Sequence, residues 1–304
     1  MSDDVPAVDI TALGREYGAA GRIEFHDTPL GPVVKLRAAG ASAVVALQGA
    51  QLLNWTPPAA SEAIWLSPLC RPAAGKSLRG GTPICWPWFG PPPEAHGGPA
   101  HGFVRGALWT PAYSKVADDE SIVAFRFRTQ RQHHAIWPHA AEVTLVVRLG
   151  KTLDLDLLTT NTGDAPFALT AALHTYFAVG DIASTEISGF DGCTYIDKLD
   201  ADARRVQAGP VGFAGEVDRI YLDAPGPVLI HDRANARIIR IDSRGSRSTV
   251  VWNPWVEKSA RLGDMTADGY RSMVCVETAN AGDDCIGLEP GGTHVLEATY
   301  SLVA

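Results

Sequence analysis

The sequence predicts an all-β protein in which large antiparallel sheets pack against one another. Apolar residues recur at every second position in many short segments, and Gly, Pro, Asn or Asp residues separate these segments. Helical periodicity is confined to a few short pieces. The 304 residues contain no repeat, low-complexity segment or linker, and an apolar content of 46% is enough for one large core. We therefore expect a single domain over residues 1–304.

Individual elements follow from the same patterns. Leu153–Leu157 reads LDLDL, which puts Asp154 and Asp156 on one face and the leucines on the other, as in an antiparallel strand with one face in solvent. The clearest helical signal is Trp255–Asp264, which follows a turn-forming Asn-Pro pair. The other segments with a clear strand pattern are Ala43–Leu47, Ile122–Phe127, Val143–Val147, Ile238–Ile241 and Val295–Tyr300.

Charge and composition exclude several classes of protein. A net charge of −8 without any run of Lys or Arg argues against binding to nucleic acid or to anionic membrane surfaces. The first ten residues lack the basic flank and apolar stretch of a secretory signal, and no apolar run approaches the length of a membrane span. Five cysteines without CxxC spacing disfavour a disulfide framework and a zinc site. We expect a cytoplasmic protein with mostly buried, reduced thiols.

The segment Arg79–Arg105 is the most unusual part of the chain. It contains six glycines and six prolines, which exclude a helix or a central strand, and it also contains Trp86, Trp88, Phe89 and Phe103. Large aromatic side chains must be buried or must bind a ligand. An ordered loop of this kind, with an arginine at each end, suits the wall of a binding site for a polar ring that carries a negative group. The alternative is a long surface loop that its own aromatic residues hold in place.

Two further segments break the plain strand pattern. In Phe167–Phe177, His174 shares one strand face with alanines, a threonine and Tyr176, which leaves room for a ligand above the sheet. In Met273–Asn280, Glu277 shares its face with Met273, Cys275 and Ala279. A histidine in such a place can instead be a structural core residue. The carboxylate can be either ion-paired or held at a raised pKa for proton transfer.

These residues together suggest acid/base chemistry on a polar substrate without a cofactor, because the sequence contains no metal or nucleotide motif. The sequence also resembles a known family. The segments RGGTPICWPWFG, HGFVRGALW, LHTYFAVGDI, GCTYIDKL, GEVDRIY, VVWNPWVEKS and MVCVETAN, in this order, are similar to the hexose-6-phosphate mutarotases (glucose-6-phosphate 1-epimerases) of the aldose 1-epimerase superfamily. The resemblance runs from about Val33 to the end of the chain, so we expect the core of the domain over residues 33–304.

The resemblance implies a galactose-mutarotase-like β-supersandwich, with the active site on the concave face of a large sheet. It implies that the enzyme interconverts the α and β anomers of hexose 6-phosphates, most simply glucose 6-phosphate, without a metal or other cofactor. The histidine of LHTYF, His174, then corresponds to the family's catalytic histidine. The glutamate of CVETAN, Glu277, corresponds to its catalytic carboxylate. We expect Glu277 to act as the base and protonated His174 as the acid.

The resemblance also implies binding residues. The family's positions match Arg79 before the glycine pair, Arg105 at the end of HGFVR, and Asp197 in YIDK. We expect the two arginines to bind the phosphate. Some members carry a glutamine in a PQFG version of the loop, where this chain has Trp88. An indole there can stack on a sugar or donate one N–H group, but it cannot accept a hydrogen bond as an amide can. His101 could bind a sugar hydroxyl or brace the loop.

Two other functions remain open from the sequence. The same acid/base pair would serve an aldose 1-epimerase that acts on unphosphorylated sugars. A non-catalytic carbohydrate-binding β-sandwich would use the aromatic and arginine residues alone. The sequence does not fix the oligomeric state, and we expect a monomer.

Overall fold

The computed structural model describes residues 8–73, 75–93, 97–129, 133 and 135–303. Within them the fold is all-β, with two eight-stranded antiparallel sheets, one four-stranded sheet and one two-stranded sheet. Two α-helices, α1 (Ile10–Tyr17) and α2 (Trp255–Arg261), are short. The short 3₁₀ helices are η1 (Val104–Gly106), η3 (Ile182–Ser184), η4 (Arg233–Asn235) and η5 (Gly269–Ser272). This architecture confirms the predicted fold class.

We call the first large sheet the β20 sheet. Its strand order is β15-β14-β16-β19-β20-β11-β5, and β12 also pairs with β20. Its strands are β5 (Ile84–Cys85), β11 (Ala171–Leu173), β12 (Tyr176–Ala178), β14 (Thr194–Asp197), β15 (Ala203–Val206), β16 (Val217–Leu222), β19 (Ser248–Asn253) and β20 (Met273–Asn280).

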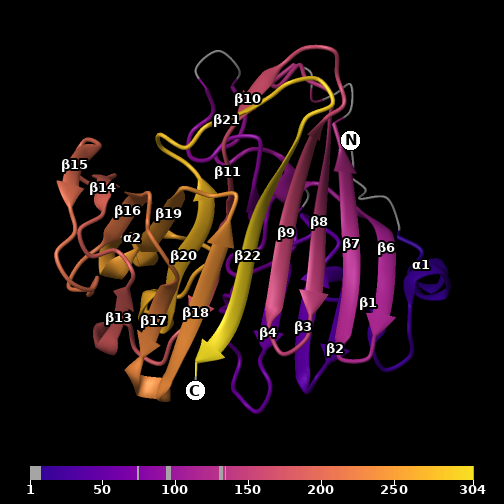
Figure 1. The fold of residues 1–304 in the computed structure, drawn as a ribbon. Coiled ribbons are helices and arrows are strands. Elements are labelled where there is room, and N and C mark those ends of the chain that lie inside the picture. Colours follow the sequence, from indigo (N-terminus) through magenta and orange to yellow (C-terminus); the bar gives the residue numbers. More distant parts are fainter. Residues whose placement is uncertain (1–7, 74, 94–96, 130–132, 134, 304) are drawn as a thin grey trace.

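We call the second large sheet the β22 sheet, in the order β13-β17-β18-β22-β9-β8-β7-β6. In Figure 1 its strands run side by side across the view, with the indigo strands of the four-stranded sheet behind them. Its strands are β6 (Thr110–Ala117), β7 (Glu120–Arg128), β8 (Ala141–Leu149), β9 (Leu153–Asn161), β13 (Thr185–Ser188), β17 (Val228–Asp232), β18 (Arg237–Arg244) and β22 (Thr293–Val303).

The two smaller sheets complete the fold. The four-stranded sheet packs on β7 and β8 through β2 and β3. Its strands are β1 (Ile23–Thr28), β2 (Gly31–Ala38), β3 (Ala41–Ala46) and β4 (Leu52–Thr56). The two-stranded sheet pairs β10 (Phe167–Leu169) with β21 (Ile286–Leu288).

The six predicted strands all overlap observed strands, and Leu47 alone lies one residue beyond its strand, β3. The predicted helix Trp255–Asp264 ends three residues early, at Arg261, because Leu262 already has an extended backbone. The sequence pattern predicts one strand over Phe167–Phe177, but this segment forms the three short strands β10, β11 and β12. The break has two causes: β10 pairs with β21 instead of β20, and a tight turn follows Leu173, whose carbonyl accepts the Thr175 N–H.

Alternation along β20 divides its side chains between the core and the outer face. Val274 and Val276 belong to the main hydrophobic core, which also contains Leu296 and Tyr300 of β22. Met273, Cys275 and Ala279 belong to separate, smaller clusters on the other face. Glu277 lies on that outer face, because it is two residues from both Cys275 and Ala279. The division expected from the sequence is confirmed.

A buried ion pair fixes the end of β12. The Asp232 carboxylate and the Arg237 guanidinium are 2.9 Å apart, and their side chains are 0% and 8% exposed. Asp232 also accepts the N–H of Gly180, and Arg237 donates to the carbonyl of Ala178. The pair therefore anchors the chain directly after the strand that carries Tyr176.

We expect Arg237→Ala to lower the free energy of unfolding by about 3–5 kcal/mol, because it leaves the Asp232 carboxylate buried without its cation. Arg240→Ala is the matched control on the same strand. Arg240 pairs with Asp242, and both side chains are 42% exposed, so its loss should cost no more than about 1 kcal/mol. Urea unfolding of the two variants measures the difference. Equal losses would contradict an anchoring role for the buried pair.

Candidate active site

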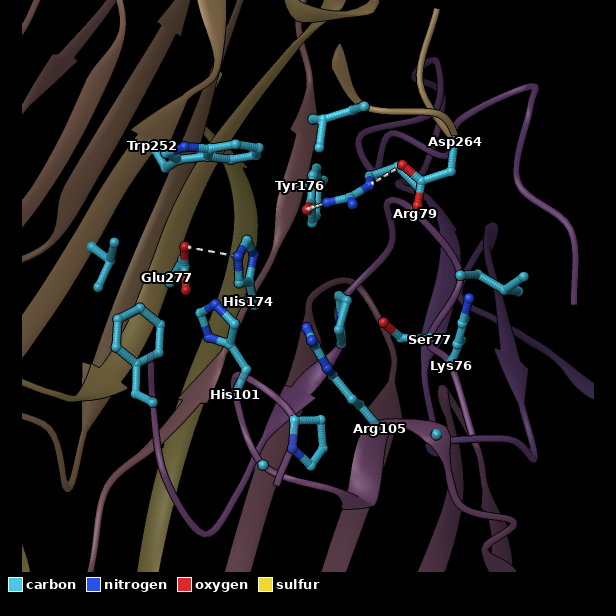
Figure 2. Close-up of a pocket in the computed structure, with 18 of the residues that line it drawn as sticks. Lys76, Ser77, Arg79, His101, Arg105, His174, Tyr176, Trp252, Asp264 and Glu277 are labelled. Atoms are coloured by element: carbon cyan, nitrogen blue, oxygen red, sulfur yellow. Dashed lines mark hydrogen bonds and ion pairs between the residues drawn. The ribbon is translucent and has the colours of Figure 1, made fainter. Parts of the chain in front are cut away.

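A cavity of about 470 Å³ opens on the outer face of the β20 sheet. Five of the seven candidate residues line it: Arg79, His101, Arg105, His174 and Glu277. Figure 2 shows His174 between Glu277 on one side and the two arginines on the other. Cavities of this size suit a small ligand such as a monosaccharide derivative.

Strand register brings His174 and Glu277 together. β11 pairs Leu173 with Thr278, and β12 pairs Tyr176 with Cys275 in the same register, so His174 lies opposite Glu277 across the break. Directly opposite residues on one sheet face have neighbouring side chains. The Nε2 atom of His174 is 3.4 Å from the Oε1 atom of Glu277, and the two side chains are 12% and 1% exposed.

This environment disfavours charge on both members of the pair. Burial raises the pKa of the Glu277 carboxyl well above its usual range, and Asp218 adds to the effect. Burial lowers the pKa of the His174 imidazole, and the positive charges nearby, including those of Arg105 and Arg79, lower it further. Among the described residues, neither His174 Nδ1 nor Glu277 Oε2 has a hydrogen-bond partner. Both atoms are buried, so each is a polar group whose hydrogen-bonding capacity the described protein contacts leave unsatisfied.

His101 forms the next part of the wall. Its ring meets that of His174 edge to face, with centroids 5.6 Å apart. Its Nδ1 accepts the N–H of Gly90 at 3.3 Å, so the neutral ring carries its proton on Nε2. Burial, with Arg105 and Arg79 close by, lowers its pKa to about 4. His101 is thus a neutral side chain at physiological pH.

The loop that carries His101 depends on close backbone contacts. A Cβ atom on Gly102, which has a positive φ, would lie 1.8 Å from the carbonyl oxygen of Trp86. A Cβ on Gly81, beside Arg79, would lie 2.1 Å from the carbonyl oxygen of Leu52. Glycine is required at both positions, and these contacts hold the two ends of the loop at the cavity.

The two arginines differ in their partners. Arg79 Nε donates to Asp264 at 2.9 Å, and Arg79 Nη1 donates to the hydroxyl of Tyr176 at 3.0 Å. Arg105 lies on η1 and donates from Nη2 to the carbonyl of Ala100 at 2.8 Å. Guanidinium groups keep their charge in such sites and fit the oxygens of a phosphate. Both arginines therefore offer a local positive region in an acidic protein.

Trp88 and Asp197 lie outside the cavity lining. Trp88 is 4% exposed and belongs to the main core, and its indole N–H donates to the carbonyl of Pro99. The neighbouring Phe89 lines the cavity instead. Asp197 accepts the N–H of Leu199 and lies near Arg205. Trp88 and Asp197 are thus placed to support the loop and the β14 hairpin.

Several lining residues were not singled out from the sequence. A row across β12, β20, β19 and β16 contains Tyr176, Cys275, Trp252 and Asp218 in register, and all of these except Cys275 line the cavity. Asp218 has its pKa raised to about 6, chiefly by burial and despite the opposing charge of Lys258. Asp218 lies within GEVDRIY, one of the motifs behind the resemblance, so that motif could have identified it. Asp264, Lys258, Lys76 and Ser77 also line the cavity.

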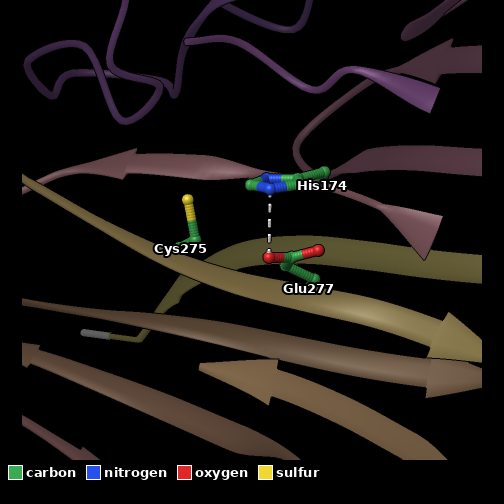
Figure 3. Close-up of side chains that lie close together, drawn as sticks. All are labelled: His174, Cys275 and Glu277. Carbon is green, nitrogen blue, oxygen red and sulfur yellow. Dashed lines mark ion pairs between the residues drawn. The ribbon is translucent and has the colours of Figure 1, made fainter. Parts of the chain in front are cut away.

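One group of residues has the donor atoms that zinc prefers. Ligand atoms of His174, Cys275 and Glu277 all lie within 4.8 Å of one another (Figure 3). Burial, followed by the charge of Glu277, raises the pKa of the Cys275 thiol, so the thiolate is disfavoured. A metal here would also occupy the lone pairs of the proton-transfer candidates. Metal binding at this pair would therefore compete with proton transfer.

Among the described residues, no helix has both the length and the apolar character needed to cross a membrane.

Relatives and solved structures share both sequence and fold with this chain. A protein of Escherichia coli K12, whose name provisionally assigns it as a glucose-6-phosphate 1-epimerase, is 40% identical over 239 residues, which cover 78% of this chain and 79% of that protein. A similarly named protein of the grass Cenchrus ciliaris is 35% identical over 281 residues, covering 88% and 84%. The crystal structure of a provisionally named mutarotase from Salmonella typhimurium superposes with a TM-score of 0.87 at 32% identity, covering 94% and 95%.

A galactose mutarotase-like protein from Clostridium acetobutylicum shares the fold with a TM-score of 0.70 at 13% identity, covering 92% of this chain and 98% of its own. The galactose-mutarotase-like β-supersandwich expected from the sequence is thus confirmed. The family model described as aldose 1-epimerase matches residues 32–301. The chain belongs to the aldose 1-epimerase family.

Proposed function

We propose that this protein is a mutarotase that interconverts the α and β anomers of hexose 6-phosphates, with glucose 6-phosphate as the foremost substrate. The observation that carries the proposal is the facing pair of His174 and Glu277 in a cavity that two arginines flank. The pair suits proton transfer at a sugar ring, and the arginines suit a phosphate. The names of the relatives, which refer to glucose 6-phosphate, support the same substrate.

The reaction consists of two proton transfers and a bond rotation. A base removes the proton from the C1 hydroxyl while an acid protonates the ring oxygen O5, and the C1–O5 bond breaks to give the open-chain aldehyde. Rotation about C1–C2 presents the other face of the carbonyl, and ring closure reverses the proton transfers. We assign Glu277 as the base and His174 as the acid. The chemistry uses no oxidant or reductant, so a redox cofactor has no step to perform.

Proton transfer requires the pair to hold one proton between its two members. Burial favours the neutral arrangement, with the proton on Glu277, over the ion pair with protonated His174. The sequence analysis expects His174 to act in its protonated form. The surroundings of His174 disfavour that form before a substrate binds. A substrate brings hydroxyl groups and a negative phosphate, and both stabilise the ion pair. We infer that the reactive protonation state forms in the substrate complex.

The phosphate would lie on the side of His174 away from Glu277, where Arg79 and Arg105 meet the cavity (Figure 2). Asp218, with a carboxyl group at the other end of the residue row, would accept hydrogen bonds from sugar hydroxyls. We further propose that the protein works as a monomer in the cytoplasm and as one domain over residues 1–304. The five free cysteines, four of them buried, support the cytoplasmic location.

Glu277→Gln should abolish mutarotation and leave sugar phosphate binding largely intact, because it keeps the shape of the side chain and removes its basicity. His174→Ala should cost much of the roughly 10²–10⁴-fold that one acid or base group supplies. It should cost far less when Glu277→Gln is already present, because acid and base act as a unit. The approach of α-glucose 6-phosphate to anomeric equilibrium measures all of these effects.

The same assay separates the alternative functions. Acceleration of phosphorylated and free sugars alike would indicate an unphosphorylated aldose as the substrate. No acceleration of either sugar, with sugar binding retained, would indicate a carbohydrate-binding protein. Turnover of the Glu277→Gln variant near the wild-type rate would contradict the proposed mechanism.

The pH dependence of the free energy of unfolding should reveal the raised pKa of Glu277 without any measurement of activity. Unfolded, the carboxyl ionises near its ordinary pKa of 4.5, whereas in the folded protein it keeps its proton to higher pH. The stability linked to this proton is therefore present below pH 4.5 and is lost as the pH rises towards the folded pKa. Glu277→Gln escapes this loss, so its advantage in the free energy of unfolding should grow with pH to about 1–3 kcal/mol.

Thermal unfolding of both proteins at acidic and alkaline pH tests this expectation. His174, with its lowered pKa, contributes the opposite slope in each protein, since its stability is lost as the pH falls below 6.5. Glu257→Gln, at an exposed position on α2, is the matched control for the loss of one carboxylate. An equal difference between Glu277→Gln and wild type at both ends of the pH range would argue against a raised pKa.

Replacing Arg79 or Arg105 by Ala should lower kcat/KM for glucose 6-phosphate by about 10–150-fold, because each change removes a charge-assisted contact worth about 1.5–3 kcal/mol. Activity on free glucose should change much less. Lysine at either position should restore only part of the loss, since it lacks the planar fork. Arg233→Ala, which removes an exposed arginine paired with Glu186, is the control. Equal losses for both sugars would place the phosphate elsewhere or remove it from the natural substrate.

A further inference from the structure

Tyr176 connects an arginine to the proton-transfer pair. Its side chain is 2% exposed, and its hydroxyl accepts a hydrogen bond of 3.0 Å from Arg79 Nη1. Its ring stacks on the imidazole of His174, with centroids 5.0 Å apart and planes inclined by 14°. The Tyr176 side chain therefore contacts both Arg79, a candidate phosphate-binding residue, and His174, the candidate acid.

Ring contacts continue on both sides, stacked towards Trp65 and edge to face towards His101 and Phe89. Rings of Trp65, Tyr176, His174, His101 and Phe89 follow one another, with successive centroids 5.9, 5.0, 5.6 and 4.9 Å apart. The indole N–H of Trp65 donates to the hydroxyl of Ser272 at 3.0 Å and so anchors one end. In a close-packed row of this kind, a displacement of Tyr176 must alter the position of His174.

Arg79 can bind an anion and is also connected to Tyr176 and His174, so a bound anion can affect both side chains. Its Nε atom bonds to Asp264 and its Nη1 atom bonds to Tyr176, which leaves the Nη2 donors, among the described contacts, for a ligand. Its charge also acts on His174 directly, because Arg79 and Arg105 both disfavour a proton on that ring. A dianion bound between these arginines would offset their effect. The hydrogen bonds of Arg79 and its charge thus both connect a bound dianion to His174.

We propose that the phosphate-binding region is an activating site: a dianion held by Arg79 raises the turnover of the sugar ring through Tyr176, in addition to improving its binding. The inference rests on the proposed function, because it requires Arg79 to contact the phosphate of the substrate. Enzymes can use the binding of a remote, non-reacting group to assist the reacting centre, and substrates that lack this group then lose kcat as well as affinity. Tyr176 is a positioning residue in this scheme.

The experiment supplies the substrate in two pieces. Xylose has the reacting ring but neither C6 nor a phosphate, and the phosphite dianion occupies the place of the missing group. Phosphite should raise kcat for xylose mutarotation in a saturable way, and glucose 6-phosphate should compete with both pieces. Anions also catalyse mutarotation in solution, so rates are compared with the same phosphite concentrations without enzyme and with the Glu277→Gln variant.

Two variants separate activation from binding. Tyr176→Phe keeps the ring on His174 and removes the hydroxyl that accepts from Arg79, so the maximal activation by phosphite should fall about tenfold, as for loss of one hydrogen bond to a charged group. Asp264→Asn removes the charge of the other hydrogen-bond partner of Arg79. Asp264 makes no ring contact with His174. Asp264→Asn should lower the phosphite concentration needed, because it removes the charge that balances Arg79, and it should retain most of the maximal activation. Each variant is judged by its own ratio of rates with and without phosphite.

The outcomes distinguish this proposal from the function on which it rests. If glucose 6-phosphate is turned over far better than xylose but phosphite fails to activate wild type, the phosphate serves only for binding, and the proposal is overturned while the function stands. Full activation of Tyr176→Phe would overturn the part assigned to Tyr176. If glucose 6-phosphate shows no advantage over free sugars, the proposed function itself fails, and the activating site with it.

Discussion

The candidate site depends on the pairing of β12 and β11 with β20 in one common register. This register places His174 opposite Glu277 on a sheet face whose other members are mainly apolar. A shift of β11 and β12 by one residue would turn His174 towards the main core, where Val274 and Val276 lie, and away from Glu277. The same pairing puts Tyr176, Cys275, Trp252 and Asp218 in a row beside the pair. Register thus sets the geometry of the candidate proton-transfer pair and of its surroundings together.

This arrangement has an energetic cost, which the fold tolerates. A carboxyl group that is 1% exposed and an imidazole that is 12% exposed lack the solvation that they would have at the surface. The surrounding structure holds them in place by other means, including the buried Asp232 and Arg237 pair beyond β12 and the hydrogen bond from the His174 N–H to the carbonyl of Pro83. Destabilised groups at one place, supported by rigid packing elsewhere, are typical of sites for proton transfer.

Alternation in the sequence identified the faces of the strands and drew attention to His174 and Glu277, whose roles the resemblance to a known family then implied. His174 and Glu277 stand out because a polar group interrupts a regular apolar or small-residue face. Sequence alone could not show that the two strands pair in register, since pairing between residues 174 and 277 is a long-range property. Sequence alone also could not show that Phe89 faces the cavity and Trp88 does not, because side-chain direction in an irregular Gly- and Pro-rich loop has no period. The row that joins Tyr176 to Asp218 becomes visible only when the register is known.

Arg79 and Arg105 differ in how far a neighbouring carboxylate balances their charge. Arg79 faces the Asp264 carboxylate at 2.9 Å, so part of its charge is already balanced, and it is joined to Tyr176. Arg105 donates to the Ala100 carbonyl and, within the described residues, forms no ion pair. In a chain with a net charge of −8, an unpaired guanidinium at the cavity gives the stronger attraction for an approaching dianion. Arg105 is therefore suited to capture the phosphate, and Arg79 to connect the captured phosphate to the ring row that contains His174.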